Sequence, residues 1–160
     1  MEPIDNPYYK TIHSNHSVDK WSLRLVEALK QIKSKVVLVC PDDTFLRKQV
    51  DYKVIEKLSN YIDNKLIAIN LEPRYDGWEI NEIFGVRDSR KKWLSSMMPH
   101  LWNKDKLIEL IGNKALSPRA VEKIGTNTPY NYGIINSNKY FDFGKEVGIY
   151  PYAITEGKWA

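Results

Sequence analysis

The sequence predicts an α/β protein whose sheet is mostly parallel and is flanked by helices. Two apolar runs, "VVLVC" at 36–40 and "LIAINL" at 66–71, lack the alternation of a strand with one face in water, so both are expected to be buried on both faces. Each run follows a segment whose apolar residues recur at helical spacing. This order of helix, strand, helix and strand is typical of an α/β layer fold, in which we expect the two strands to lie side by side.

The two helices that precede these strands have favourable starting residues. The first is expected over 19–33, where Ser17 or Asp19 can cap the free backbone N–H groups of the first turn. The second is expected over 51–62 and begins at Asp51, which is also a good capping residue.

The second half of the chain is less regular. Residues 72–92 show no sustained period and are expected to form a long excursion from the sheet. One short helix is expected to end at Gly112, and another has Ser117 as its cap and Pro118 in its first turn. Further short strands are expected within 93–102, 130–136 and 147–155.

Length and composition limit the domain organisation and the compartment. The chain has 160 residues, 42% of them hydrophobic, which predicts a single domain over residues 1–160. Its one cysteine, Cys40, excludes an internal disulfide, and the first residues lack the features of a secretory signal. No apolar run approaches the roughly 20 residues that cross a bilayer. We therefore expect a cytoplasmic protein without a transmembrane segment, with peripheral attachment at the inner face of the membrane left open.

The charge pattern bears on which negatively charged partner the chain could bind. The net charge is +4, and Lys and Arg are interspersed with Asp and Glu. This mild excess is compatible with a phosphate-bearing ligand, a nucleic acid or an anionic membrane surface. A nucleic-acid-binding protein gathers its basic residues on one face, so the interspersed pattern disfavours that class.

An acidic pair follows the first predicted strand. Asp42 and Asp43 are adjacent, and two neighbouring carboxylates repel each other unless a cation lies between them. Ligands of open α/β sheets bind beyond the carboxyl ends of the strands, and carboxylate oxygens suit Mg²⁺ or Mn²⁺. The pair is therefore a candidate metal site, and the alternative is a solvated acidic turn.

Other residues are candidates for contact with a substrate. Glu122 is the best single candidate for a general base, and the alternative is an exposed acid on a surface helix. Trp78 lies beside Tyr75 in a polar stretch, where aromatic rings flanked by acids can hold a sugar or anchor a loop. His100 is assigned with them as a substrate contact, although its position between Pro99 and Leu101 favours a structural or solvated role.

Several stretches in fixed order resemble a known family. They are "DKWSLRLVEALKQIKSKVVLVCPDDTFL", "MMPHLWNKDKLIELI", "LSPRAVEKIGT" and "GKW", which extend over residues 19–159. The order and spacing are similar to those of bacterial glycosyltransferase-like proteins of the GT-A type, which build surface polysaccharides. The resemblance implies a GT-A-like (Rossmann-like) fold in partial or shortened form.

The resemblance also implies chemistry. Asp42 and Asp43 match the acidic motif that holds Mn²⁺ or Mg²⁺ against a nucleoside diphosphate sugar, and Glu122 matches the base that deprotonates the saccharide acceptor. Ala120 stands where the family usually has a bulky aromatic residue, which predicts a different acceptor pocket. The family's nucleotide-binding segment is expected to be missing. The alternatives are a fragment, a shortened relative whose donor-binding half comes from a second chain, and a protein that has lost donor binding. Whether the chain transfers sugar by itself stays open, and the alternative is a non-catalytic basic protein that binds nucleic acid or another protein.

Overall fold

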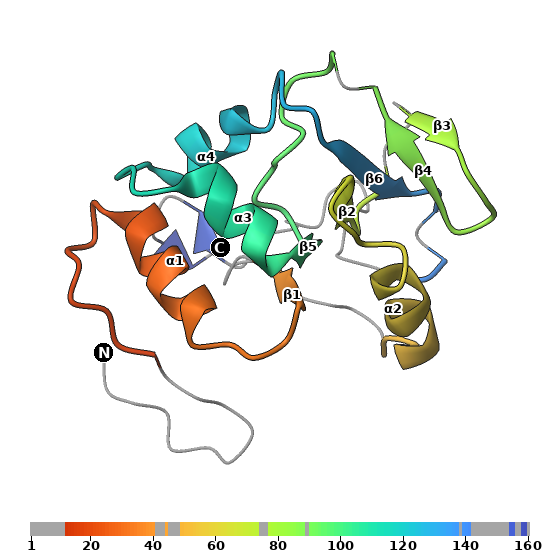
Figure 1. Cartoon of the computed structure of the whole chain (residues 1–160). Helices are drawn as coiled ribbons and strands as arrows, with labels where there is room; N and C mark the ends of the chain where they lie inside the picture. The colour runs from red at the N-terminus through yellow and green to blue at the C-terminus, as the bar shows by residue number, and fades with distance from the viewer. Residues whose placement is uncertain are drawn as a thin grey trace.

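The computed structural model of the chain forms one six-stranded sheet with helices on both of its faces (Figure 1). A separate pair of short antiparallel strands, β7 (Ile154–Thr155) and β8 (Lys158–Trp159), lies near the end of the chain. The structure describes residues 12–40, 44, 49–73, 77–88, 90–137, 139–141, 154–155 and 158–159.

The large sheet has the strand order β1-β5-β2-β6-β4-β3. Only β2 and β6 are parallel neighbours, and each of the other adjacent pairs is antiparallel. The strands are β1 (Val36–Val39), β2 (Leu66–Asn70), β3 (Gly77–Glu79), β4 (Phe84–Arg87), β5 (His100–Asn103) and β6 (Asn131–Ile135).

The prediction of a mostly parallel, GT-A-like sheet is wrong. We expected β1 and β2 to be neighbours, but β5 lies between them and is antiparallel to both. An unalternated apolar run signals burial on both faces and says nothing about the direction of the adjacent strand. β2 is indeed central and buried, whereas β1 is an edge strand whose Leu38 is 45% exposed.

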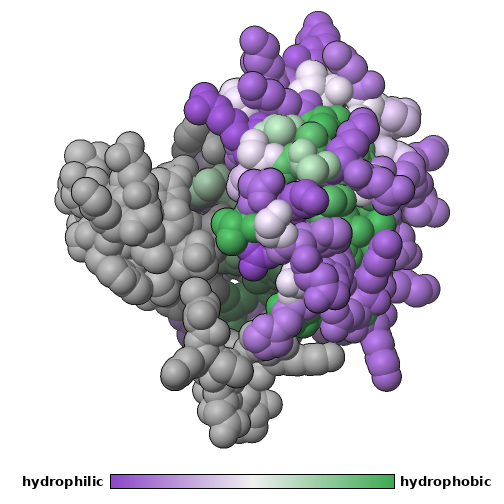
Figure 2. Space-filling view, turned by 90° about the vertical axis from the view of Figure 1, so that its left-hand side faces the viewer, coloured by the Kyte–Doolittle hydropathy of each residue, from purple (hydrophilic) through white to green (hydrophobic). Residues whose placement is uncertain are grey.

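Two hydrophobic clusters hold the helices on opposite faces of the sheet. α1 (Trp21–Lys30), α3 (Lys104–Ile111) and α4 (Pro118–Ile124) share one cluster, and α2 (Tyr52–Ser59) contributes to the other. Figure 1 shows α1, α3 and α4 together on the left and α2 apart from them on the right. Seen from the left of that view, the described residues are mostly hydrophilic around a smaller hydrophobic area (Figure 2). The first cluster is built around Val26, Leu29, Ile67, Trp102, Leu107, Val121 and Tyr132, and the second around Leu58, Ile69, Leu101, Phe84 and Ile135.

Local capping explains where several helices begin and end. The side chain of Asp51 accepts a hydrogen bond from Lys53 N at 2.9 Å, and Ser117 Oγ accepts one from Ala120 N at 3.3 Å, as the sequence predicted. Gly112 ends α3 with a φ of 59°, a conformation that glycine adopts without a steric penalty. α1 is shorter than expected and begins after Lys20, which makes no side-chain capping bond, so the prediction that Ser17 or Asp19 caps this helix is wrong.

The stretch expected to be a long excursion contains a strand pair. β3 and β4 are antiparallel within it, and β4 joins the sheet through β6. All three residues of β3 are exposed, so it has no buried face that could produce an alternating pattern in the sequence. A Cβ on Gly85 would lie 2.4 Å from the carbonyl oxygen of Trp78, so the close approach of the two strands requires glycine there.

Candidate functional site

The carboxyl-terminal ends of three strands lie at the same end of the sheet. β1 and β2 are both antiparallel to β5, and β6 is parallel to β2, so β1, β2 and β6 run in one direction. Val39 in β1 and Asn70 in β2 both pair with His100, the first residue of β5. The segment 93–99, which leads into β5, therefore reaches the end of the sheet where the carboxyl-terminal residues of β1 and β2 lie.

An open pocket lies between this segment and α4. Its volume is about 480 Å³, within the usual range for a small-molecule site. The wall from α4 carries a carboxylate and a guanidinium, and the wall from the segment carries an indole and a hydroxyl. The lining residues are Trp93, Ser96, Met98, Pro118, Arg119 and Glu122.

Glu122 joins the two walls of the pocket. One of its carboxylate oxygens, Oε1, accepts a hydrogen bond from the backbone N–H of Met97 at 3.1 Å and a longer one from Ser96 Oγ at 3.5 Å. Its side chain is half-buried, so one face of the carboxylate stays in contact with the pocket. The predicted candidate base thus lies on a short helix, as expected, and borders an accessible cleft.

Trp93 has an unusual backbone conformation. Its φ is 65°, in the left-handed region, which is a genuine outlier for a bulky residue. Two donors hold its carbonyl oxygen: Arg87 Nη1 at 3.1 Å and the backbone N–H of Ser96 at 3.2 Å. Strained residues of this kind concentrate at ligand-binding and catalytic sites, where the surrounding structure maintains them.

Two cations on α4 face the Trp93 ring. The guanidinium carbon of Arg119 lies 6.0 Å from the ring centroid, and Lys123 Nζ lies 5.5 Å from it. Residues four apart share one face of a helix, so both cations and Glu122 point toward the same side of α4.

A buried serine fixes α4 against the segment. Ser95 Oγ donates to the carbonyl oxygen of Val121 at 2.8 Å and accepts from the backbone N–H of Gly125 at 2.9 Å. A Cβ on Gly125 would lie only 2.8 Å from Ser95 Oγ and from the hydroxyl of Tyr132. The contact therefore requires both a small hydroxyl side chain and a glycine.

His100 lies next to the pocket and contacts one of its lining residues, Met98. Its ring is buried, stacks on Trp102 at 5.7 Å between centroids, and places Nδ1 2.7 Å from the carbonyl oxygen of Met98. Because Met98 lines the pocket, His100 contacts the site through backbone and not as an exposed ligand. Asn70, its partner in β2, accepts a bond from Glu72 N at 2.8 Å, and its buried Nδ2 has no partner among the described residues.

The remaining sequence candidates lie elsewhere. Trp78 is 60% exposed on the edge strand β3, which Figure 1 places at the far side of the sheet from α4. Asp42, Asp43 and Tyr75 lie outside the described residues. Among the residues that the structure does describe, no three His, Cys, Asp or Glu side chains lie close enough together to hold a metal ion. In the same part of the chain, no helix is long and apolar enough to cross a membrane.

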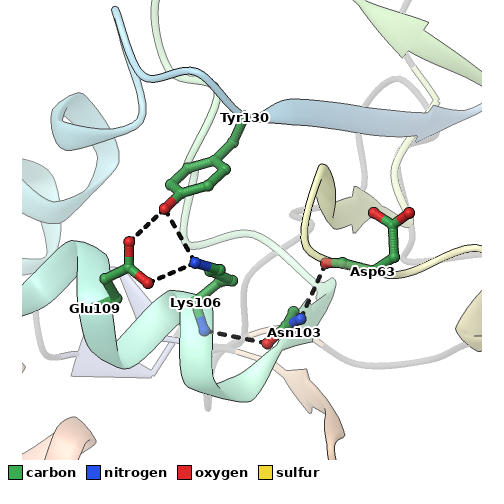
Figure 3. Close-up of polar contacts among 5 residues, drawn as sticks. All are labelled: Asp63, Asn103, Lys106, Glu109 and Tyr130. Atoms are coloured by element: carbon green, nitrogen blue, oxygen red, sulfur yellow. Dashed lines mark hydrogen bonds and ion pairs between the residues drawn. The ribbon is translucent and has the colours of Figure 1, made fainter.

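A second polar cluster lies where α3 meets the start of β6 (Figure 3). Lys106 Nζ donates to Glu109 at 2.6 Å and to the hydroxyl of Tyr130 at 3.3 Å, and the Tyr130 hydroxyl also donates to Glu109. The contacts with Lys106 and Tyr130 lower the pKa of Glu109 below its ordinary value. These groups satisfy one another, so this cluster ties α3 to the sheet and we assign it a structural role.

Three of the pocket's groups were not identified from the sequence. Trp93, Ser96 and Arg119 come from two separate segments, and only folding brings them together. A usable signal was present in the helix, because Arg119, Glu122 and Lys123 have the spacing of a single helical face.

Comparison with known proteins does not assign the chain to a family. No family model matches it, and neither a curated protein nor a solved structure does. Function is therefore inferred from the pocket itself.

Proposed function

We propose that the chain binds a nucleotide sugar in the pocket between segment 93–99 and α4 and transfers the sugar to a saccharide acceptor. The observation that supports this is the presence of the Glu122 carboxylate and the Trp93 ring in one open pocket. An aromatic face offers an apolar platform for a sugar ring, and a carboxylate accepts hydrogen bonds from sugar hydroxyls. Precisely placed polar groups in such a pocket provide orientation and specificity.

Glu122 is the proposed general base. In the transfer, the acceptor hydroxyl oxygen attacks the anomeric carbon and its proton passes to the Glu122 carboxylate. The bond between the anomeric carbon and the diphosphate oxygen breaks, and its electron pair leaves with the diphosphate. A base of this kind must lie within hydrogen-bonding reach of the proton that it removes, so the acceptor hydroxyl is expected beside the free oxygen of Glu122.

Asp42 and Asp43 remain the proposed ligands of Mn²⁺ or Mg²⁺, because carboxylate oxygens suit these hard cations. A divalent ion would neutralise the charge that grows on the leaving diphosphate. The topology is favourable, since both residues follow β1, which ends at the edge reached by segment 93–99. A second chain remains the proposed source of further donor contacts.

The test compares two carboxylate variants. Wild-type protein is incubated with Mn²⁺, a saccharide acceptor mixture and either UDP-glucose or GDP-mannose, and release of UDP or GDP is measured. Glu122→Gln is expected to lower the rate by about 10²–10⁴-fold, the usual contribution of a general base, with little change in donor binding. Glu56→Gln, which alters an exposed glutamate on α2, serves as the matched control. Equal rates for wild type and Glu122→Gln would exclude the assigned role.

A protein that binds the nucleotide sugar without turnover is the second candidate. It is favoured by the contacts of Glu122 Oε1, which is already occupied by Met97 N and Ser96 Oγ and so helps to hold the fold together. Under this alternative, UDP-glucose or GDP-mannose binds to the purified chain, but no free UDP or GDP is released. Absence of binding by either nucleotide sugar, with and without Mn²⁺, would exclude both candidates.

A further inference from the structure

We propose that Arg119 and Lys123 form a subsite for the phosphate groups of the ligand, and that this subsite works without a metal ion. The inference rests on the proposed function, because it names the part of a nucleoside diphosphate that α4 recognises. Arg119 lines the pocket, and Lys123 lies outside the lining but over the same Trp93 ring. It adds a second means of charge neutralisation to the one assigned to Asp42 and Asp43.

The two cations are placed to act together. They are one helical turn apart on α4, and both lie over the Trp93 ring, at 6.0 Å for Arg119 and 5.5 Å for Lys123. Both side chains are exposed, and neither forms an ion pair with a carboxylate among the described residues. Two cations that are adjacent and not neutralised by a carboxylate favour the approach of an anion with more than one negative charge.

The adjacent carboxylate does not cancel this effect. Glu122 lies between the two cations in sequence, but its Oε1 is held by Met97 N and Ser96 Oγ on the opposite wall of the pocket. The three side chains together carry one net positive charge. A guanidinium can donate two parallel hydrogen bonds to a phosphate, and an ammonium adds a mobile point charge beside it.

The Trp93 ring gives the cations a fixed base. Its carbonyl oxygen is anchored by Arg87 and by the N–H of Ser96, which maintains the left-handed backbone at φ 65°. Stacking against this ring limits the positions that the long side chains of Arg119 and Lys123 adopt. Preorganisation of this kind lowers the entropy lost when a ligand binds.

The experiment measures binding in the presence of EDTA. Inorganic pyrophosphate, UDP and uridine are titrated calorimetrically into wild-type protein and into the double variant Arg119→Gln/Lys123→Gln. The control variant Arg24→Gln/Lys30→Gln removes the same two charges from exposed positions on α1. Thermal unfolding of all three proteins verifies that each is folded.

Pyrophosphate and UDP are expected to bind wild type without metal and at least tenfold more weakly to Arg119→Gln/Lys123→Gln, because two charge-assisted contacts are lost. Uridine, which lacks phosphate, should bind wild type and the double variant with equal affinity. The control variant should bind all three probes within about twofold of wild type, since screening limits the effect of distant charges.

Two results would overturn the subsite: no binding of pyrophosphate to wild type in EDTA, or equal binding of pyrophosphate to wild type and to the α4 double variant. Failure of the proposed function has a different signature. In that case pyrophosphate binds through Arg119 and Lys123, but UDP-glucose and GDP-mannose do not bind even with Mn²⁺. If instead pyrophosphate does not bind in EDTA but the nucleotide sugars bind with Mn²⁺, the proposed function stands and the subsite is removed.

Discussion

The backbone N–H of Met97 donates a hydrogen bond to Glu122 Oε1 across 3.1 Å, which joins the segment entering β5 to α4. Glu122 is therefore both a wall of the pocket and a structural contact between two elements that are distant in sequence. The Ser95 hydroxyl reinforces the same junction through Val121 and Gly125. The shape of the pocket depends on these few bonds, because the segment has no regular secondary structure of its own.

Replacing Glu122 should separate its structural role from its chemical one. Glu122→Gln keeps an oxygen that accepts the Met97 N–H bond, whereas Glu122→Ala removes it and leaves a part-buried donor unpaired. We expect Glu122→Ala to lower the free energy of unfolding by about 1 kcal/mol and Glu122→Gln to lower it by less. Urea unfolding followed by tryptophan fluorescence measures both values. If Glu122→Gln lowers the free energy of unfolding as much as Glu122→Ala does, the contact with Met97 N–H needs the negative charge.

Ser95 should affect both stability and the pocket. Ser95→Ala removes two hydrogen bonds and leaves a buried carbonyl and a buried N–H without their partner, so we expect a loss of about 1–3 kcal/mol. α4 should also lose its fixed position, which weakens binding of UDP or pyrophosphate.

Ser22 supplies the matched control for Ser95. It is also buried, donates to the carbonyl oxygen of Lys114 at 2.6 Å and accepts from Leu116 N at 2.7 Å, but it fixes α1 and does not line the pocket. Ser22→Ala should destabilise the protein by a similar amount and leave ligand affinity unchanged once the protein is folded. Equal loss of affinity in both variants would show a general effect of lowered stability.

Trp93 tests whether the left-handed backbone is strained. Trp93→Ala and Trp93→Gly both remove the ring, but only glycine adopts φ 65° without a steric penalty. We expect the Gly variant to be more stable than the Ala variant by about 1 kcal/mol. The same pair at Lys92, whose φ is not positive, should give the opposite order because alanine restricts the unfolded chain more. Thermal and urea unfolding of the four variants measure the difference.

Sequence reasoning succeeded for several local signals, although not at the start of α1, where the cap is Lys20 and not Ser17 or Asp19. Asp51 and Ser117 cap helices through their own side chains, and Gly112 ends α3 through its own φ, so neighbouring residues contain the information. The apolar run of β2 likewise predicted its burial on both faces correctly.

Strand order was not available from the same kind of evidence. The four-residue β5 lies between β1 and β2, and nothing in its sequence, "HLWN", specifies those partners. Pairing between distant segments is decided by how the whole chain closes, which a local pattern does not report. The pocket has the same limitation: Glu122 was recognisable as a candidate, but the Met97 N–H and the left-handed Trp93 that define its surroundings are features of the folded backbone.

Asp88, which lies outside the pocket, should make the stability of the folded protein depend on pH. The Arg90 side chain donates to both carboxylate oxygens, with Nη2 at 2.7 Å from Oδ2 and Nε at 2.9 Å from Oδ1, and the Arg90 backbone N–H adds a third donor. These contacts lower the pKa of Asp88 from 3.8 to about 2. Because the folded state favours the ionised form, the resulting stability is fully present above about pH 4 and is lost as the pH falls through about 2.

Two variants isolate this contribution from that of other carboxylates. Asp88→Asn has no titrating carboxyl, so the stability difference between wild type and Asp88→Asn should shrink as the pH falls from 5 to 2. Arg90→Gln removes the guanidinium, the main cause of the shift, but keeps the backbone donor, and should reproduce only part of the change. Urea unfolding at pH 5, 4, 3 and 2 measures all three proteins. A difference that stays constant over this range would mean that Asp88 titrates alike in the folded and unfolded chains, and that its contacts with Arg90 contribute nothing through ionisation.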